Sequence, residues 1–265
     1  MSKEGFILDA YAIGMPKPET RIIPEEVAPK FFAEHFKVYE FLNGEARGKK
    51  VLEVGCGDGY GAAYLADVAS EVTAIDYDQE VVARALAKYG RANLKFLPME
   101  AGALRFEDNS FDVVCSFQVI EHISEAAIGR YLSEIKRVLR PRGSFYLSTL
   151  NLEHAVKSPK TYKKNPAHCK EFVLTELNDL LLSEFASVEI YGLHLTPKHR
   201  FYQRLKKIGL PVKRFYDSIT TADFKVTSGN LRRCVSFICV CHKSAVAREI
   251  SSGQGIQVGG QLIQP

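Results

Sequence analysis

The architecture of the chain follows from one stretch: Lys50-Val51-Leu52-Glu53-Val54-Gly55-Cys56-Gly57-Asp58-Gly59-Tyr60-Gly61. Its first five residues are mostly apolar and predict a short buried strand. Four glycines at every second position then predict a tight turn, and a helix is expected over 60–69. Strand, turn and helix form the first half of a βαβ unit. Glycines let a ligand approach the backbone, and the N–H groups at the helix start point toward that ligand.

Two carboxylates near this turn indicate a binding site. Glu53 lies inside the apolar strand, where a carboxylate is costly unless it has a partner. Asp76 ends the next predicted strand, roughly 20 residues further on, where the acid that binds ribose hydroxyls lies in this architecture. The segment 57–62 also satisfies the loose dinucleotide pattern G-x-G-x-x-G/A, which ordinary tight turns satisfy as well.

Four segments of the chain together resemble, in their order and spacing, the motifs of class I S-adenosylmethionine-dependent methyltransferases. Within this class the chain resembles the type 11/25 methyltransferases, which act on bacterial small molecules and surface sugars. The four segments are residues 51–59, 74–78, 111–122 and 137–143. The last segment departs from the family pattern, because Arg142 stands where a second glycine is usual. The main alternative interpretation of the glycine turn is a nicotinamide-dependent dehydrogenase. The motifs at 111–122 and 137–143 are not expected in such an enzyme, so they favour the methyltransferase. No phosphate-binding G-x-x-x-x-G-K-[ST] loop is present.

The resemblance implies S-adenosylmethionine as the cofactor and assigns residues to each of its parts. Glu53 and the glycine turn would hold the amino and carboxylate end, and Asp76 would accept from the two ribose hydroxyls. Tyr77 would lie against the adenine ring. The full predicted cofactor set is Glu53, Gly55, Cys56, Gly57, Gly59, Asp76, Tyr77, Glu100, Ala101, Gln118 and Val119.

A second resemblance concerns the acceptor side. The segment Asn165-Pro166-Ala167-His168-Cys169-Lys170-Glu171-Phe172 resembles the Asn-Pro-x-His-x-x-Glu-Phe signature of bacterial methyltransferases of cell-surface sugar and secondary-metabolite pathways. Histidine is the usual base for an oxygen acceptor, so His168, oriented by Glu171, is the first catalytic candidate. The alternative is that His168 only anchors its loop. His122, directly after the fourth strand, is the second candidate, and His154 is a weaker third.

Strands alternate with helices from residue 50 onward, which predicts an α/β fold. We expect a doubly wound, seven-stranded, Rossmann-like methyltransferase sheet that is mostly parallel with an antiparallel last strand. The expected strands are 50–54, 71–76, 94–97, 111–117, 144–149, 187–191 and 233–241. Residues 1–245 form a single domain in this prediction, with an N-terminal cap (1–45), a core (46–191), an insertion (192–230) and the last strand, and 246–265 form a disordered tail.

The N-terminal cap is predicted to contain a helix that starts at Pro24. It either packs on the sheet edge or covers the cofactor cleft, in which case His35 or Tyr39 would touch the substrate. The insertion mixes basic and aromatic residues, which fits a solvated face, an anionic small molecule or RNA, in that order.

Composition limits the function classes. The 265 residues are 46% hydrophobic and 25% charged, with a net charge of +4, as in ordinary globular proteins. No signal peptide or membrane-spanning run is visible, so we expect a cytoplasmic protein. The six cysteines do not form C-x-x-C pairs, and no metal site is predicted.

The sequence therefore predicts an enzyme that transfers a methyl group from S-adenosylmethionine to a small-molecule acceptor, with an oxygen of a sugar or another metabolite as the first expectation. The alternatives are an RNA or protein methyltransferase, or a cofactor-binding subunit without catalysis. A nucleic-acid substrate is disfavoured, because the Asn/Asp-Pro-Pro-Tyr type of motif is absent after the fourth strand and no separate RNA-binding module is visible.

Overall fold

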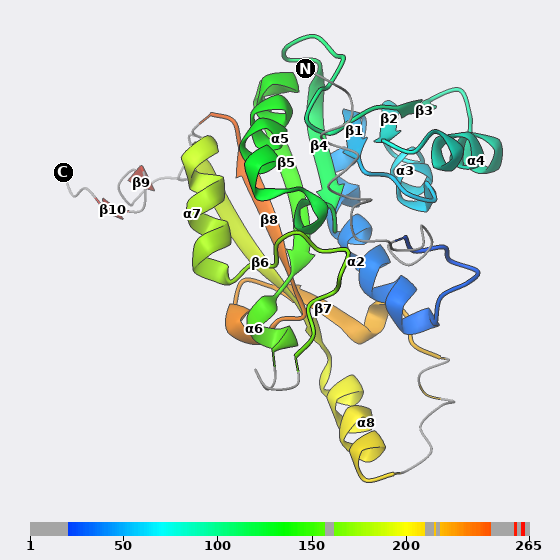
Figure 1. Cartoon of the computed structure of the whole chain (residues 1–265), viewed down its shortest axis with the longest axis vertical. Helices are drawn as coiled ribbons and strands as arrows, with labels where there is room; N and C mark the ends of the chain where they lie inside the picture. The colour runs from blue at the N-terminus through cyan, green and yellow to red at the C-terminus, as the bar shows by residue number, and fades with distance from the viewer. Residues whose placement is uncertain are drawn as a thin grey trace, which may run out of the picture.

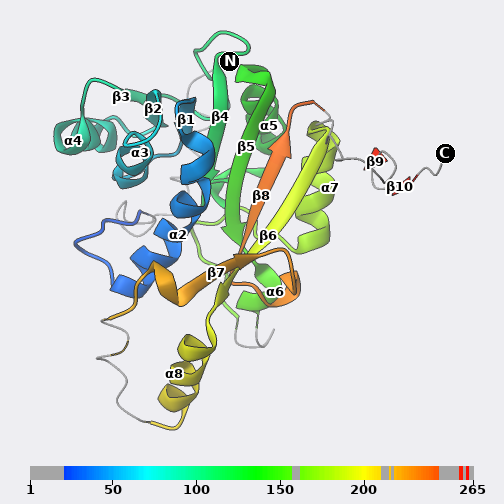
Figure 2. The same ribbon diagram turned by 180° about the vertical axis from the view of Figure 1, so that it is seen from behind.

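A computed structural model describes residues 21–156, 162–209, 215, 218–244, 257–258 and 261–262. An eight-stranded sheet with the order β3-β2-β1-β4-β5-β8-β6-β7 runs through the molecule, with helices on both faces (Figures 1 and 2). The strands are β1 (Lys50–Val54), β2 (Glu71–Asp76), β3 (Leu94–Pro98), β4 (Phe111–Phe117), β5 (Leu139–Leu150), β6 (Ser187–Leu195), β7 (Phe224–Thr227) and β8 (Ser236–His242).

The first five strands are parallel, as predicted. β1 lies at the centre and pairs with β2 on one side and β4 on the other. β3 extends the sheet beyond β2, and β5 extends it beyond β4. The strand order therefore reverses between β1 and β4, and ligands of such sheets bind at the carboxyl ends of the strands near this point.

The remaining strands correct the predicted count of seven. β8 is the expected antiparallel strand between β5 and β6, but an eighth strand, β7, pairs with the second half of β6. β6 continues past residue 191, because Gly192 lets it pass close to Cys234, whose Cβ is 2.5 Å from an ideal Cβ at that position. The predicted insertion thus belongs partly to the sheet.

Two sets of helices cover the sheet. α2 (Pro29–Ala46), α3 (Tyr60–Leu65) and α4 (Gln79–Tyr89) pack on one face, and α5 (Glu125–Val138) and α7 (Leu174–Glu184) pack on the other. α2 begins five residues after the predicted start, because 24–27 form a turn. β5 begins at Leu139, so most of the predicted turn at 137–143 is strand.

Short elements complete the carboxyl edge of the sheet. The 3-10 helix η1 (Ile120–His122) follows β4, and α6 (Leu152–Ala155) follows β5. The loop 162–172, called the His168 loop below, returns to this edge: Leu152 N–H donates to Phe172 O at 3.1 Å. α8 (Pro197–Lys207) projects away from the sheet (Figure 1). The 3-10 helices η2 (Thr221–Asp223) and η3 (Leu231–Arg233) flank β7.

In the predicted tail, β9 (Gln257–Val258) and β10 (Gln261–Leu262) form a small antiparallel pair. The other residues of 246–265, and residues 1–20 of the predicted cap, lie outside the described part of the chain. All six cysteines are free thiols, and five are buried. Within the described ranges, no helix combines the length and the apolar character needed to cross a membrane.

Candidate active site

The glycine turn joins β1 to α3 and rests against the end of β2. Gly55 N–H and Cys56 N–H both donate to Ile75 O, at 2.8 and 2.9 Å. Gly55, Gly57 and Gly59 have φ values of 81°, 53° and 93°, which favour glycine. An ideal Cβ on Gly59 would lie 2.8 Å from the ring of Phe96, so a side chain would collide there.

Glu53 is the buried carboxylate beneath this turn, with 1% of its surface exposed. The Tyr39 hydroxyl of α2 donates to Glu53 Oε1 at 2.6 Å, whereas Oε2 has no hydrogen-bond partner among the described residues. Burial raises the pKa of Glu53 to about 7, although the hydrogen bond from Tyr39 opposes this shift. Tyr39 therefore holds one carboxylate oxygen, and the backbone N–H of Ala62, at the start of α3, also favours the ionised form of this buried carboxylate.

Asp76 ends β2 and is 6% exposed. Its Oδ2 accepts from Gly57 N–H at 3.1 Å, and its Oδ1 accepts from Asp78 N–H at 3.1 Å. Arg21 donates to Oδ1 at 3.2 Å and lies over the Tyr77 ring, with its guanidinium carbon 5.4 Å from the ring centroid. The sequence analysis missed Arg21, because nothing local in the irregular N-terminal segment ties it to Asp76.

The residues predicted to hold adenine lie at the same edge. Tyr77 is 54% exposed, and Glu100 and Ala101 are half-buried in the segment after β3. Met99 N–H donates to Asp76 O at 2.9 Å, which brings this segment beside the end of β2. Tyr77, Glu100 and Ala101 thus flank Asp76 from two neighbouring strands.

Gln118 and Val119 follow β4 and face the glycine turn. Gln118 has a φ of 56°, and its Nε2 donates to Ser148 Oγ at 3.1 Å. Val119 packs on Gly55 so closely that an ideal Cβ there would lie 2.5 Å from Val119 Cγ2. A small pocket opens beside them, and its lining residues are Glu34, His35, Val38, Tyr39, Tyr60, Phe117, Gln118, Ser148, Leu193 and Ser236. The structure shows the predicted packing of the N-terminal helix, since Val38, Tyr39 and Leu42 are buried in the core, and it also places His35 and Tyr39 in the wall of this pocket.

The predicted catalytic residues come together, although they are far apart in the chain. Cys169 N–H and Lys170 N–H donate to Glu121 O, which fastens the His168 loop to η1. His168 Nδ1 lies 2.7 Å from Glu171 Oε1, and His122 Nδ1 lies 2.9 Å from Ala167 O. The two imidazole rings meet edge to face with centroids 5.0 Å apart.

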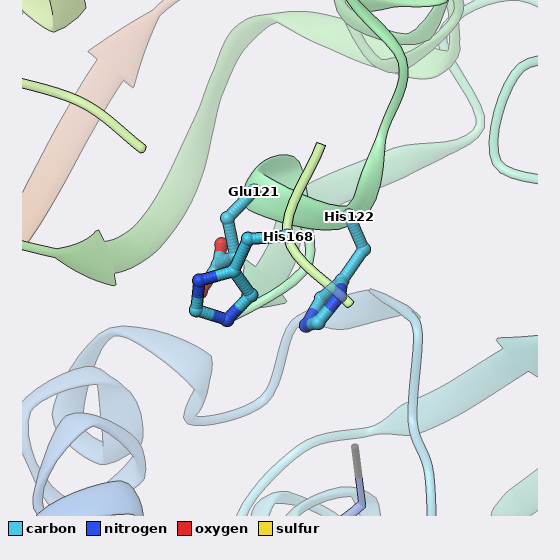
Figure 3. Close-up of side chains that lie close together, drawn as sticks. All are labelled: Glu121, His122 and His168. Carbon is cyan, nitrogen blue, oxygen red and sulfur yellow. The ribbon is translucent and has the colours of Figure 1, made fainter. Parts of the chain in front are cut away.

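Glu121 is a third member of this cluster, and the sequence analysis did not single it out. It is 1% exposed, and Thr149 Oγ1 donates to its Oε2 at 3.0 Å. Burial raises the pKa of Glu121 to about 7 and lowers that of His122 to about 4, so His122 is neutral at neutral pH. The side chains of Glu121, His122 and His168 extend to the same side of η1 (Figure 3). His154, the weaker candidate, lies on α6 outside this cluster.

Comparison with known proteins identifies the family of the chain. Residues 52–147 match the model of a methyltransferase domain family. A probable S-adenosylmethionine-dependent methyltransferase of Mycolicibacterium smegmatis is 39% identical over 184 residues, which cover 69% of this chain and 68% of the relative. The ubiquinone biosynthesis O-methyltransferase of Psychrobacter cryohalolentis is 29% identical over 177 residues, covering 58% of this chain and 66% of the relative. The chain thus spans about two thirds of the length of both relatives.

A solved structure shows the same fold. The YcgJ protein of Bacillus subtilis superposes with a TM-score of 0.54 at 20% sequence identity, over 78% of this chain and 97% of that chain. The overall fold is therefore shared with a known protein. Motifs, relatives and topology lead to one conclusion: the chain belongs to the class I S-adenosylmethionine-dependent methyltransferases.

Proposed function

We propose that this methyltransferase transfers the methyl group to an oxygen of a small-molecule acceptor, such as a sugar or another hydroxylated metabolite. The observation that carries this proposal is the pair of imidazoles, His122 and His168, beside the carboxyl ends of β4 and β5. An oxygen acceptor has to lose a proton, and imidazole is the usual group that takes it. Carbon and amine acceptors have less need of such a group.

The residues on the cofactor side fit S-adenosylmethionine. The unpartnered Oε2 of Glu53 suits an ammonium group, and the glycine turn leaves its backbone accessible. The Asp76 carboxylate, at the end of β2, suits a pair of neighbouring hydroxyls. Tyr77, Glu100 and Ala101 would adjoin the adenine, and Gln118 and Val119 the methionine portion. When bound, this cofactor supplies an electrophilic methyl group on a positively charged sulfur.

On the acceptor side, His168 would take the proton. Its Nδ1–H donates to Glu171, so its Nε2 carries a lone pair, and Glu171 in turn accepts from the Tyr162 hydroxyl. His122 is fixed in the same tautomer by Ala167 O and is the second candidate. Both rings are thus oriented before an acceptor arrives, which lowers the entropic cost of alignment.

The pocket beside Gln118 offers an acceptor both polar and apolar contacts. α2 contributes Tyr39 and Val38 to its wall, and β6 contributes Leu193. The O-methyltransferase relative is named for ubiquinone biosynthesis, which supports an oxygen acceptor without identifying it. Acceptor choice would then reside in the N-terminal cap and in the insertion 192–230, because both contribute to this wall.

Methyl transfer from labelled cofactor tests the proposal. The purified chain is incubated with panels of phenols, sugars and hydroxylated lipids, with RNA and protein as competing classes, and the methylated atom is identified by mass spectrometry. We expect an O-methyl product of a small molecule. A product methylated only on nitrogen or carbon, or only on RNA, would contradict it.

A further inference from the structure

The two imidazoles and the buried carboxylate beside them have the arrangement of a metal-binding site. Glu121, His122 and His168 each offer one ligand atom, and all three atoms lie within 4.8 Å of one another. Bonds of about 2.0–2.2 Å to a shared tetrahedral ion place ligand atoms roughly 3.3–3.6 Å apart, so the three side chains have to move together by up to about 1.5 Å when the ion binds. We propose that these three residues bind one divalent transition-metal ion, a site that the spacing of residues along the chain did not predict.

The hydrogen bonds around the cluster support this proposal. Each imidazole donates its Nδ1–H to a fixed acceptor, His122 to Ala167 O and His168 to Glu171 Oε1. Both Nε2 atoms therefore carry the lone pairs that a metal ion requires. Metal-binding histidines almost always have their second nitrogen held in this way by a carbonyl or a carboxylate.

One present contact has to change when an ion binds. The Asn165 amide lies 3.3 Å from His168 Nε2 and interacts with its lone pair. Asn165 is exposed, so its side chain can turn toward solvent, although this movement also breaks the 3.0 Å hydrogen bond from Ala167 N–H to Asn165 Oδ1. The His168 loop also contacts η1 through the hydrogen bonds of Cys169 N–H and Lys170 N–H to Glu121 O and of Cys169 Sγ to His122 O, and none of these involves a proposed ligand atom.

Charge also favours a cation. Glu121 and Glu171 are 1% and 9% exposed, and neither forms an ion pair with a lysine or arginine among the described residues. Buried carboxylates without a cationic partner are costly. Two nitrogen ligands and one oxygen ligand favour ions such as Zn²⁺, Mn²⁺ or Co²⁺ over Mg²⁺ and Ca²⁺.

The chemical role of the ion rests on the proposed function, although its binding does not. Three protein ligands leave positions open for an acceptor hydroxyl. The ion would withdraw electron density from that oxygen, and its proton would pass to solvent water. The oxygen then forms the bond to the methyl carbon, and the pair of the broken carbon–sulfur bond stays on sulfur. In this arrangement His168 acts as a metal ligand in place of a base.

Metal titration of the full chain tests the site directly. The protein is stripped with EDTA, dialysed and titrated with Co²⁺ and with Zn²⁺, followed by calorimetry and by the visible absorption of Co²⁺. We expect one ion per chain, with affinity lowered by 10–100-fold or more in His168→Gln and in Glu171→Gln, which loses the carboxylate that orients His168. His242→Gln is the matched control, because His242 pairs with Ser144 at the opposite edge of the sheet.

Two results would overturn the inference: no saturable binding by the stripped parent up to millimolar ion, or equal affinity in His168→Gln and the parent. Thermal unfolding of each variant shows whether it is folded, so a loss of binding is interpreted only in folded protein. Methyl transfer that continues in EDTA would refute the role of the ion and leave the proposed function standing. Ion binding that depends on His168, without O-methylation of any acceptor, would refute the proposed function and leave the site standing.

Discussion

Glu53 is the residue whose burial is hardest to explain by stability alone. It lies in a central strand, one oxygen is bound by Tyr39, and the other has no partner among the described residues. Burial raises the pKa of Glu53 to about 7. Such a shifted, partly unsatisfied carboxylate next to a glycine turn is typical of binding sites.

The first prediction concerns the pH dependence of stability. Because the folded-state pKa of Glu53 is raised from 4.5 to about 7, the folded parent loses stability as pH rises through this window. Glu53→Gln cannot ionise and therefore lacks this loss. The unfolding free energy of the variant minus that of the parent should be larger at pH 8 than at pH 5, by on the order of 1–3 kcal/mol. Denaturant unfolding at both pH values measures the difference. A difference that does not change with pH would show that Glu53 is ionised in the folded protein throughout.

The second prediction concerns Asp76. Asp76→Ala should weaken S-adenosylmethionine binding by roughly 1–3 kcal/mol, because the ribose hydroxyls lose a charged acceptor. Arg21→Gln is the companion variant: it breaks the Arg21–Asp76 ion pair but keeps the carboxylate, so its affinity should stay close to that of the parent. Calorimetry gives both dissociation constants. Equal binding by Asp76→Ala and the parent would refute the ribose assignment.

At the scale of single residues, the sequence predicted which carboxylates belong to the site but not which side chains form hydrogen bonds with them. Glu53 and Asp76 were found because a carboxylate inside or at the end of an apolar strand stands out. Tyr39 and Arg21 were not paired with them, because those contacts join segments that only the folded chain brings together. Glu121 was overlooked for the same reason, since its partner Thr149 lies on another strand.

At the scale of elements, the contact between α2 and α3 controls the geometry of Glu53. An ideal Cβ on Gly61 would lie 2.1 Å from the Tyr39 ring. The third prediction is that Gly61→Ala lowers the melting temperature, with a cost of about 1–3 kcal/mol from overpacking. It should also weaken cofactor binding, because Tyr39 has to move away from Glu53.

Gly129→Ala is the control for this variant. Gly129 lies in α5 with nothing within 4 Å of an ideal Cβ, so alanine should stabilise the protein by up to about 1 kcal/mol. Differential scanning calorimetry compares the two. A stabilised Gly61→Ala protein would mean that α2 is not packed on α3 as described.

The fourth prediction concerns α8, whose exposed bases Lys198, Arg200 and Arg204 lie on the element that projects from the sheet. Replacing all three with glutamine should leave cofactor affinity unchanged, because α8 is remote from the glycine turn. If the basic face of α8 is only a solvated surface, the triple variant should also keep the parent's KM for a neutral acceptor. Salt-sensitive RNA retention that disappears in the triple variant would instead favour a nucleic-acid acceptor. The patch also included Lys206 and Lys207, whose side chains the structure does not describe, and Lys213 and Arg214, which lie outside the described residues.

Elements with strong local patterns were predicted well. β1 and β2 have the predicted bounds, because each is an apolar run ended by a glycine or an acid. β7 was missed, because its four residues have no pattern of their own and exist as a strand only through β6. The start of α2 was placed too early, because a proline followed by acids is equally compatible with a turn.

At the scale of the whole molecule, the sheet sets where chemistry can occur. The five parallel strands have their carboxyl ends at the same edge of the sheet. The glycine turn, Asp76 and η1 all lie at this edge. The sequence predicted this edge through the α/β alternation. It could not show that the His168 loop folds back onto η1, because that contact depends on backbone hydrogen bonds to Glu121 O formed across the chain. The candidate catalytic cluster is therefore a product of tertiary structure, whereas the motifs of the predicted cofactor site are largely local.

Single-turnover methyl transfer to an oxygen acceptor, measured with the parent, His168→Gln and His242→Gln, tests the proposed function most directly. With either a base or a metal ligand at position 168, His168→Gln should keep its affinity for S-adenosylmethionine and transfer the methyl group about 10²–10⁴-fold more slowly. His242→Gln should match the parent. Full transfer rates in both His168→Gln and the corresponding His122→Gln protein would contradict the account, because alignment alone would then drive the reaction.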